Sequence, residues 1–574
     1  MNAEDQSINS SQTRGTGTRK TMPFQKYKAF KPIPLSDRTW PDKVISEAPR
    51  WCSVDLRDGN QALIEPMTPN EKQKMYDLLL EIGFTEIEVG FPAASQTDFD
   101  FVRKIIEEDR IPDGVTIQVL CQAREELIRR TCEAVAGAKR VIFHLYNSTS
   151  TLQRKVVFNK SREEVIKLAT DATQMVKNNT RELVASGTDL TLEYSPESYT
   201  ATEMEFAVEI CAAVMNVWQP TVDDQIILNL PSTVEMATPN VYADQIEYFT
   251  RHLPHRENAV ISLHTHNDRG TGVAASELGL MAGAERIEGT LFGNGERTGN
   301  LDVITMAMNM FSQGIDPELY FGEMSKIVAI SEECTKIPIH IRQPYAGELV
   351  FTAFSGSHQD AIKKGMQFVE SGSDSAWEVP YLPIDPSDVG GSYRETVRVN
   401  SQSGKGGVAF ILENYFGVLL PRSVLLEFSP IVQAISEADG GELKPEVIWG
   451  AFVNEFIEVE GPYQLLDYQV QTEGNGSEIC NAKIQVADNE VDVSGVGSGP
   501  IDAFINAMVE TLNEPLNVED YQEYGLNEGS EAQAICILAI TDDEGNKHYG
   551  VGISQNTTTA ALKSIIAAVN RKWR

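Results

Sequence analysis

The sequence predicts an α/β protein: a (β/α)8 TIM barrel, then a mainly helical linker subdomain, then a C-terminal α+β domain. Between residues 51 and 320, short β-branched runs alternate eight times with longer helical stretches. The alternation ends near Phe321, where prolines and loops become frequent. Residues 426–574 carry 25 acidic side chains against seven basic ones, a shift typical of a separate domain. We therefore expect an N-terminal arm at 1–50, the barrel at 51–320, the linker subdomain at 321–425 and the C-terminal domain at 426–574.

The N-terminal arm divides into two parts by composition. Residues 1–22 are polar and rich in Ser, Thr and Gly, which predicts a mobile segment. Residues 23–50 hold several prolines and aromatic residues, so we expect an extended segment that packs on the body of the protein.

The barrel prediction rests on eight strand-like runs. They are Ser53–Asp58, Glu86–Phe91, Thr116–Cys121, Arg140–Tyr146, Asp189–Ser195, Gln225–Pro231, Val260–His266 and Arg286–Phe292. Between them, segments such as 70–82, 162–185, 203–216 and 241–252 place apolar residues at helical spacing. A doubly wound open sheet is the alternative, but eight strand–helix units within about 270 residues favour a closed barrel.

The C-terminal domain contains two similar passages. Val491–Ala507 and His548–Val569 each predict a strand, a glycine-rich turn and a helix. The glycines of these expected turns are Gly495, Gly497 and Gly499 in the first passage and Gly550 and Gly552 in the second. We interpret the passages as a duplicated unit.

Charge and cysteine content exclude some classes of function. A formal net charge of −35 disfavours binding to nucleic acid or to an anionic membrane surface. No apolar run is long enough to span a bilayer, and the N-terminus lacks the apolar core of a secretory signal. Seven cysteines stand singly, without a CxxC pair, which indicates reduced thiols in a cytoplasm.

The residues that could carry chemistry follow the strands, because barrel enzymes place their sites on the loops after the strand C-termini. The first strand ends in Leu56–Gln61, which contains the pair Arg57 and Asp58. Burying such a pair is costly unless the two charges meet each other or a ligand. A structural ion pair is one interpretation; the functional one gives Asp58 to a metal and Arg57 to a substrate oxygen.

The seventh strand ends in His264-Thr265-His266. Residues i and i+2 of a strand point the same way, so both imidazoles would face one point at the catalytic end. Together with Asp58 they would form a three-ligand site for a divalent cation with open positions. Asn300, at the end of the glycine-rich segment Gly293–Asn300, could add an oxygen ligand.

In combination, these motifs match a known family. Leu56–Gln61, His264–Asp268 and Gly293–Asn300 resemble the aldolase-type barrels that use acetyl-CoA or cleave related thioesters. Three further segments resemble the long form of α-isopropylmalate synthase: Ser355–Gly365, Val379–Pro386 and Val399–Gly407. The resemblance runs from about residue 23 to the C-terminus. It implies a Claisen-type condensation of acetyl-CoA with 3-methyl-2-oxobutanoate and hydrolysis of the thioester to 2-isopropylmalate and CoA, the first committed step of leucine biosynthesis.

The resemblance also implies roles in the barrel. A divalent cation, Mg²⁺ or else Mn²⁺ or Zn²⁺, would sit on Asp58, His264 and His266 with Asn300 nearby. Arg57 and Thr233 would hold the ketone and carboxylate oxygens of the oxo acid. Glu197 would lie near acetyl-CoA. The branched tail of the oxo acid would meet Leu120, His144, Ser195, Asn229 and Pro231.

Outside the barrel, the resemblance implies a homodimer with composite sites. His358 and Tyr381 would reach from the linker subdomain into the barrel of the second subunit. Either His358 or Glu197 would take the methyl proton of acetyl-CoA. The C-terminal domain would bind leucine as a feedback inhibitor, near Gly497 and Gly499.

Three other functions remain open from the sequence. Homocitrate and citramalate synthases would differ in the pocket for the oxo-acid tail. A lyase such as hydroxymethylglutaryl-CoA lyase would carry a cysteine in a lid loop, and Gly293–Asn300 has none. A leucine-sensing protein without catalysis would not need the metal and base residues.

Overall fold

The chain forms two compact units in a computed structural model. One comprises Met1–Met310 with Ile315–Glu318, and the other Phe311–Gly314 with Leu319–Arg574. The structure describes residues 23–371, 376–391, 405–439, 443–473, 476–513, 515–526, 532–542 and 545–574. The predicted mobile segment 1–22 and residues 399–404 of the Val399–Gly407 motif lie outside these ranges. The predicted domain boundaries stay a prediction.

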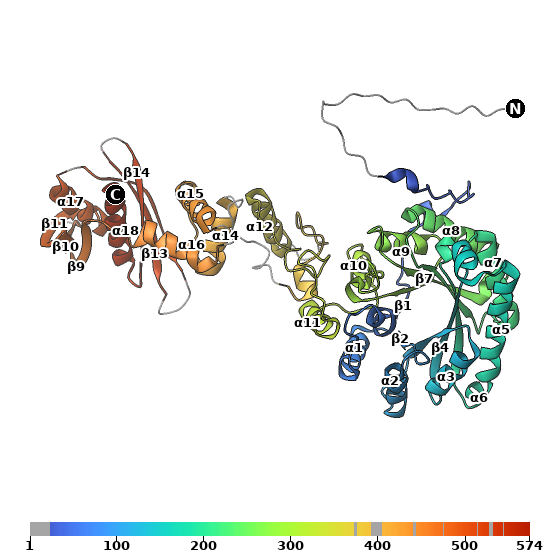
Figure 1. Cartoon of the computed structure of the whole chain (residues 1–574). Coiled ribbons are helices and arrows are strands. Elements are labelled where there is room, and N and C mark those ends of the chain that lie inside the picture. Colours follow the sequence, from blue (N-terminus) through green and yellow to red (C-terminus); the bar gives the residue numbers. More distant parts are fainter. Residues whose placement is uncertain are drawn as a thin grey trace, which may run out of the picture. The chain divides into compact units, whose positions relative to one another are not determined.

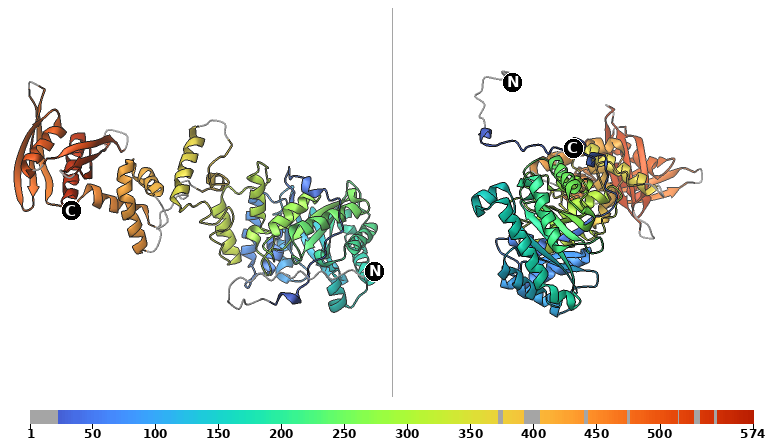
Figure 2. Two further views of the ribbon diagram at one scale, coloured as in Figure 1. Left: turned by 90° about the horizontal axis from the view of Figure 1, so that it is seen from above. Right: turned by 90° about the vertical axis from the view of Figure 1, so that its right-hand side faces the viewer.

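The first unit is the predicted barrel (Figures 1 and 2). Eight parallel strands close on themselves in sequence order, with β1 paired to both β2 and β8. They are β1 (Arg50–Ser53), β2 (Glu86–Gly90), β3 (Thr116–Gln122), β4 (Arg140–Ser148), β5 (Asp189–Glu197), β6 (Ile226–Ser232), β7 (Ala259–Thr265) and β8 (Arg286–Gly289). The closed barrel is confirmed, and the alternative of an open sheet is excluded.

Helices surround these strands (Figure 1). They are α1 (Pro69–Ile82), α2 (Gln96–Glu107), α3 (Glu125–Val135), the short α4 (Thr151–Gln153), α5 (Arg162–Asn179), α6 (Arg181–Ala185), α7 (Met204–Trp218), α8 (Pro239–His252), α9 (Gly272–Met281) and α10 (Val303–Phe311). Local sequence sets several helix ends. Capping boxes start α1 at Thr68 and α5 at Ser161, and the left-handed Gly83 ends α1.

The first strand ends earlier than predicted. β1 stops at Ser53, and Asp55–Gly59 forms a π-helical turn in which the Gly59 amide donates to the Val54 carbonyl (3.1 Å). Asp55 explains the turn, because its buried carboxylate accepts from the Leu291 amide (3.0 Å) and the Ser53 hydroxyl (2.8 Å). Burial raises the pKa of Asp55 to about 7 in spite of these hydrogen bonds. Arg57 and Asp58 therefore lie on a turn tied to the loop after β8.

The arm before the barrel packs on α8, as predicted. Arg38 donates to both carboxylate oxygens of Asp244 (2.8 Å each), and the Trp40 indole donates to the same carboxylate (2.8 Å). The Thr39 amide donates to Glu247 (2.8 Å). Asp244 and Glu247 are buried, and these bonds, together with one from Arg251 to Glu247, satisfy both carboxylates.

The second unit begins with helices. They are α11 (Met324–Thr335), α12 (Gly356–Ser371), α14 (Lys405–Phe416), α15 (Arg422–Asp439) and α16 (Pro445–Phe452). Two three-stranded antiparallel sheets follow, each with a helix after it. Their elements are β9 (Tyr463–Thr472), β10 (Glu478–Val486), β11 (Asn489–Gly497) and α17 (Pro500–Leu512), then β12 (Asn517–Gly525), β13 (Ala534–Thr541), β14 (Lys547–Ser554) and α18 (Thr557–Lys572).

Apart from a smaller cluster around Ile362 of α12, two apolar cores stabilise the described part of the second unit. One lies among both sheets, α17 and α18, with Phe504, Leu538 and Leu562 fully buried. The other joins α14, α15 and α16 to the opposite side of β13 and β14, around Phe428 and Phe452. The mainly helical region and the α+β region therefore share buried side chains.

The duplicated unit is confirmed, but most of its glycines lie in strands and not in turns. A Cβ atom on Gly495 in β11 would overlap the Ala503 carbonyl of α17, and one on Gly552 in β14 would overlap the Ala560 carbonyl of α18. The contacted residue follows the glycine by eight positions in both copies. Each glycine therefore permits close contact between a strand and the next helix. Gly499 alone lies in the turn, as the N-cap of α17.

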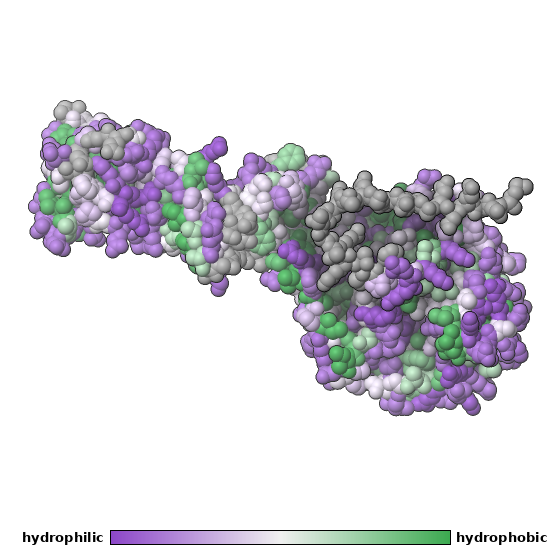
Figure 3. Space-filling view, turned by 45° about the horizontal axis from the view of Figure 1, so that its top comes forward, coloured by the Kyte–Doolittle hydropathy of each residue, from purple (hydrophilic) through white to green (hydrophobic). Residues whose placement is uncertain are grey.

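Surface features agree with the composition. The face in Figure 3 is mostly hydrophilic, with small hydrophobic patches. All seven cysteines are buried and free. Among the described helices, none is long and apolar enough to cross a membrane.

We expect Gly552→Ala to destabilise the second unit by about 1–3 kcal/mol, because the added methyl must displace helix backbone. Denaturant unfolding followed by circular dichroism measures the change in midpoint. Gly499→Ala is the matched control, since no atom lies within 4 Å of its Cβ position and its φ is −167°. An unchanged midpoint for Gly552→Ala would contradict the packing role of this glycine.

Candidate metal and active site

Asp58, His264 and His266 form a buried cluster of possible metal ligands. One donor atom from each lies within 4.8 Å of the others. The Asp58 Oδ2 atom is 3.2 Å from Nε2 of His264 and 3.7 Å from Nε2 of His266. His264 and Thr265 are the last two residues of β7, whereas Asp58 lies on the turn after β1. Barrel closure therefore brings together the three residues that the sequence predicts.

Two orphaned polar atoms suit this cluster to a cation. His266 Nδ1 and Asn300 Oδ1 are buried without a hydrogen-bond partner. The Asn300 amide donates through Nδ2 to Asp58 Oδ2 (2.6 Å), and this nitrogen lies 3.4 Å from His264 Nε2. Asn300 would bind a cation through oxygen after its side-chain amide turns over. Two imidazoles, one carboxylate and an amide fit a divalent ion.

Burial and neighbouring charges shift the pKa values of Asp58, His264 and His266. Burial disfavours ionisation of Asp58, but the Arg57 guanidinium and then the imidazoles hold the pKa of this carboxyl well below its usual range. Burial likewise disfavours the imidazolium of His264, but Asp58 and Glu288 raise its pKa to about 9. Burial and then the adjacent His264 lower the pKa of His266 to about 4. At neutral pH, one imidazole is therefore charged and the other is neutral.

Glu288 orients His264. Its Oε2 atom lies 2.8 Å from His264 Nδ1, which leaves Nε2 directed at Asp58. Arg286 and Gln118 donate to the other Glu288 oxygen, at 3.0 and 2.8 Å. The metal cluster is therefore continuous with a polar network inside the barrel.

Arg57 lies beside this cluster, and two carboxylates hold its guanidinium in position. Its guanidinium donates to Asp58 Oδ1 (2.6 Å) and to Glu88. The side chain is nearly buried but borders the cavity at the barrel mouth. A cation in this position can stabilise negative charge on a ligand oxygen.

A cavity of about 160 Å³ opens above the cluster. The structure brings to its wall every barrel residue predicted for catalysis or substrate binding, together with the three predicted metal-binding residues of the cluster. The wall comprises Arg57, Asp58, Gln61, Leu120, His144, Tyr146, Ser195, Glu197, Asn229, Pro231, Thr233, His264, His266, Glu296 and Arg297. Four of these residues, Gln61, Tyr146, Glu296 and Arg297, were not predicted. Each belongs to one of the motifs or strand ends described above, so position after a strand was the available signal.

The polar groups of the cavity floor bind one another. His144 lies 2.8 Å through Nδ1 from Glu88 Oε1 and 2.7 Å through Nε2 from the Ser195 hydroxyl. Asn229 donates to Ser195 (3.1 Å) and to Glu288 (3.1 Å). Most of these polar atoms already have partners, and Asn229 Oδ1, which has none, is a hydrogen-bond acceptor. The floor therefore offers little to a negatively charged substrate tail.

A second acidic cluster lies below the floor and does not resemble a metal site. Donor atoms of His144, Glu193 and Glu288 lie within 4.8 Å of one another. The Nη1 atom of Arg286 is 3.0 Å from Glu288 and 3.3 Å from Glu193, so the guanidinium of Arg286 already pairs with both residues. Burial, then the charge of Glu288, raises the pKa of Glu193 well above its usual range. Burial therefore disfavours the ionised form of Glu193.

The glycine-rich segment wraps around Asn300. A Cβ atom on Gly295 would overlap the Asn300 amide, and one on Gly299 would overlap the Gly293 carbonyl. The φ of Gly299 is +93°, a conformation that favours glycine. Arg297 closes the loop by donating to Asp268 (2.7 Å) and to the Thr233 carbonyl oxygen (2.5 Å). The segment therefore positions the side chain of Asn300.

His358 and Tyr381 belong to the second unit, where the structure brings them together. Their rings stack with centroids 3.9 Å apart and planes inclined by 22°. Tyr381 is exposed and has a φ of +67°. The pair thus presents a phenol and an imidazole on one surface.

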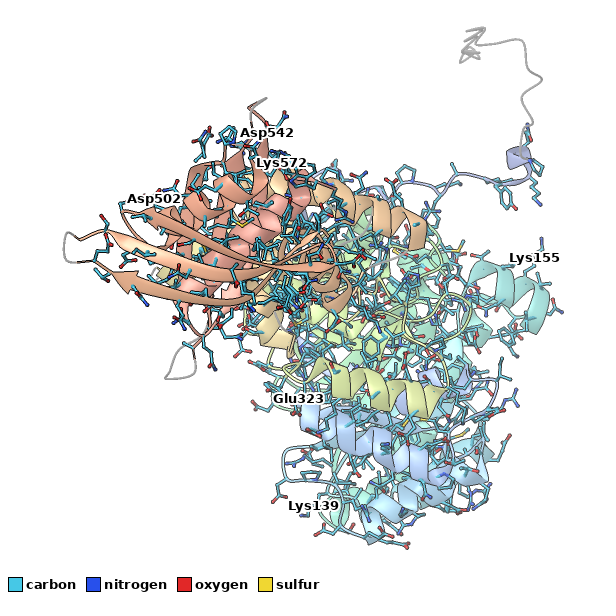
Figure 4. All side chains as sticks on the ribbon, turned by 90° about the vertical axis from the view of Figure 1, so that its left-hand side faces the viewer. Lys139, Lys155, Glu323, Asp502, Asp542 and Lys572 are labelled. Atoms are coloured by element: carbon cyan, nitrogen blue, oxygen red, sulfur yellow. The ribbon has the colours of Figure 1, made fainter. Side chains whose placement is uncertain are left out.

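The two predicted leucine-site glycines flank Ser498, just before α17, the helix that carries Asp502 (Figure 4). Gly497 ends β11 and Gly499 caps the helix. The Ser498 amide and hydroxyl donate to Asp502 Oδ2, at 2.8 and 3.0 Å. The ligand of this turn stays a prediction.

Comparison with known proteins covers nearly the whole chain. The HMGL-like family matches residues 48–331, the family "Alpha-isopropylmalate synthase, post-catalytic domain-like" matches 348–413, and "LeuA allosteric (dimerisation) domain" matches 442–573. A 2-isopropylmalate synthase from Rhodospirillum rubrum is 54% identical over 550 residues, covering 96% of this chain and 98% of that protein. Another from Clostridium acetobutylicum is 52% identical over 555 residues, covering 96% and 99%.

Solved structures also resemble the chain. The crystal structure of an HMG-CoA lyase from Bacillus subtilis aligns with a TM-score of 0.41 and 20% identity, covering 52% of this chain and 97% of that one. An HMG-CoA lyase from Brucella melitensis aligns with a TM-score of 0.41 and 16% identity, covering 51% and 100%.

We expect Mn²⁺ binding at pH 7 to release about one proton per ion. His264, with its pKa near 9, must lose a proton to become a ligand, whereas His266 is already neutral. Release should fall as pH rises through 9. Titration calorimetry in buffers of different ionisation enthalpy measures it.

The same titration tests the second acidic cluster. One ion per chain is expected, and Glu193→Gln should leave that ratio unchanged, whereas Asp58→Asn should weaken binding. Two ions per chain, or no proton release at pH 7, would contradict this description of the site.

Proposed function

The chain belongs to the 2-isopropylmalate synthase family, and we propose that its barrel condenses acetyl-CoA with 3-methyl-2-oxobutanoate and hydrolyses the thioester, giving 2-isopropylmalate and CoA. This is the first committed step of leucine biosynthesis. One observation carries the proposal: relatives of that name are more than half identical over almost their whole length. The predicted metal and substrate residues also share one cavity.

We propose that Arg57 and Thr233 hold the ketone and carboxylate oxygens of the oxo acid. A bound divalent cation, which we propose to be Mg²⁺ with Mn²⁺ or Zn²⁺ as alternatives, would supply Lewis-acid polarisation of the ketone. Asp58, His264 and His266 would hold it, with Asn300 as an additional ligand. Arg57, fixed by Glu88, stabilises the negative charge that develops on the ketone oxygen.

The cavity floor supports a neutral, branched tail on the substrate. Leu120 and Pro231 supply apolar surface, and the polar atoms of His144, Ser195 and Asn229 bond to one another and to buried neighbours. A second carboxylate, as in 2-oxoglutarate, would approach Glu88 and Glu288 without a free cation. This argues against homocitrate synthesis, because burying an unpaired charge is expensive.

A base must take a proton from the acetyl methyl group before the new carbon–carbon bond can form. Glu197 borders the cavity, and His358 stacks on Tyr381 in the second unit. We propose that these residues share the work: one of Glu197 and His358 accepts the proton, and Tyr381 donates to the enolate or thioester oxygen. Water then cleaves the thioester, and CoA leaves as the thiol.

We propose a homodimer in which His358 and Tyr381 complete the site of the second subunit. The match to a dimerisation domain supports the dimer. Support for a covered site comes from exposed apolar side chains on the loops after β1, β4 and β6, all at the catalytic end. They are Ile64, Leu152, Val156, Val157, Phe158, Val234 and Met236. An apolar surface of this kind usually meets a partner.

We further propose that leucine inhibits the enzyme through the C-terminal domain, near Gly497 and Gly499. The printed family description, "LeuA allosteric (dimerisation) domain", supports an allosteric ligand there. A cytoplasmic location, without nucleic acid or membrane as partner, agrees with the net charge of −35 and seven buried free cysteines.

Release of CoA from acetyl-CoA tests the function. We expect rapid turnover with 3-methyl-2-oxobutanoate and slower turnover with pyruvate or 2-oxoglutarate. Chelation should abolish it, Mg²⁺ or Mn²⁺ should restore it, and leucine should reduce it. Preference for 2-oxoglutarate or pyruvate would assign a different synthase, and no turnover with metal and both substrates would overturn catalysis.

Arg57→Ala should lower kcat about 100-fold while KM for the oxo acid changes less, because its charge acts most strongly in the transition state. Steady-state kinetics measure both constants. Metal content of the variant is the control, since removal of Arg57 also frees Asp58. A normal kcat would exclude Arg57 from this role.

A further inference from the structure

Glu197 is held in the cavity wall by the neighbouring strand. It ends β5 and pairs in register with Ser148, the last residue of β4. The Thr149 amide and hydroxyl both donate to the Glu197 carbonyl, at 3.1 and 3.2 Å. The backbone of Glu197 is thereby fixed, and only its side-chain torsions are free to vary.

The Ser148 hydroxyl fixes the side chain as well. It donates to Oε2 of Glu197. Within the part of the chain that the structure describes, no ion pair reaches this carboxylate, because Arg57 is engaged by Asp58 and Glu88. Ser148 therefore selects which carboxylate oxygen remains available to the cavity.

A neutral donor suits a carboxylate that must accept a proton. A guanidinium partner stabilises the charged form strongly and weakens the base, as Arg57 does for Asp58. A hydroxyl orients the group with a smaller effect, since neutral hydrogen bonds are about half as strong as charge-assisted ones. A serine at position 148 thus orients the Glu197 carboxylate without placing a positive charge beside it.

Resting on the proposed function, we infer that Ser148 is a positioning residue for Glu197: its hydroxyl occupies Oε2 and directs Oε1 toward the methyl group of acetyl-CoA. Positioning of this kind is worth much in rate, because small displacements of a reacting group cost on the order of 100-fold. Ser148 itself contacts no substrate in this scheme and acts through Glu197.

Three variants test the inference, after wild-type turnover has been established. Ser148→Ala should lower kcat about 10- to 100-fold and leave KM for 3-methyl-2-oxobutanoate within about twofold. Ser148→Thr keeps the hydroxyl and should stay within about threefold of the wild type. Ser148→Cys, with only a weak donor, should fall between them.

Ser150→Ala is the matched control. Ser150 lies two positions on, caps α4 by accepting from the Gln153 amide (3.3 Å), and has no bond to Glu197. It should have near-normal kcat. Unfolding midpoints of all variants separate positioning from misfolding.

A double-mutant cycle gives the decisive readout. In a Glu197→Gln background, Ser148→Ala should cause no further loss, because the group on which it acts has gone. Multiplicative losses, or a wild-type kcat for Ser148→Ala, would overturn the role of Ser148 alone. Absence of turnover by the wild type with metal and both substrates would instead overturn the proposed function and this role with it.

Discussion

Arg286 lies in the centre of the barrel with its guanidinium fully buried, and the acidic groups around it depend on this charge. It donates to Glu86 (2.6 Å), Glu288 (3.0 Å) and Gln118 (2.7 Å). Burial opposes ionisation of Glu288, yet hydrogen bonding to His264 and the charge of Arg286 hold its pKa well below its usual range. Without this cation, a carboxylate in the barrel interior would take up a proton. Glu288 would then no longer fix the ring of His264 as an anion.

From Arg286 the order of the site can be followed outward. Glu288 orients His264 and accepts a hydrogen bond from Asn229. Glu88 holds both Arg57 and His144 in position. The predicted metal ligand His264, the guanidinium of Arg57 and the cavity floor are thus parts of one hydrogen-bonded network. In the protein interior, a buried charge without a partner is costly. This constraint also gives the floor its preference for a neutral tail, because no charge in the network is free to meet another.

Much of the fold and of the candidate site could be predicted from the sequence. The features that could not be predicted have physical reasons. Strand alternation, together with the i, i+2 spacing of His264 and His266, predicted the barrel and the metal cluster. The turn at Asp55 did not follow from propensity, since it depends on a hydrogen bond to Leu291, 236 positions away. Glycines in β11 and β14 were assigned to turns because glycine serves both sharp turns and close packing. The roles of Glu88, Glu193 and Arg286 depend on which strands face one another inside the closed barrel.

The contacts of the arm with α8 have a consequence for the order of folding. Arg38 and Asp244 are 206 residues apart, and β1 must pair with β8 to close the barrel. During synthesis, the arm therefore emerges long before α8, and β1 emerges long before its second partner β8. Contacts of such sequence separation form late, because the chain between them must first be ordered. One edge of β1 would stay unpaired until β8 has left the ribosome. The incomplete barrel is therefore the stage at which this chain most needs protection from aggregation.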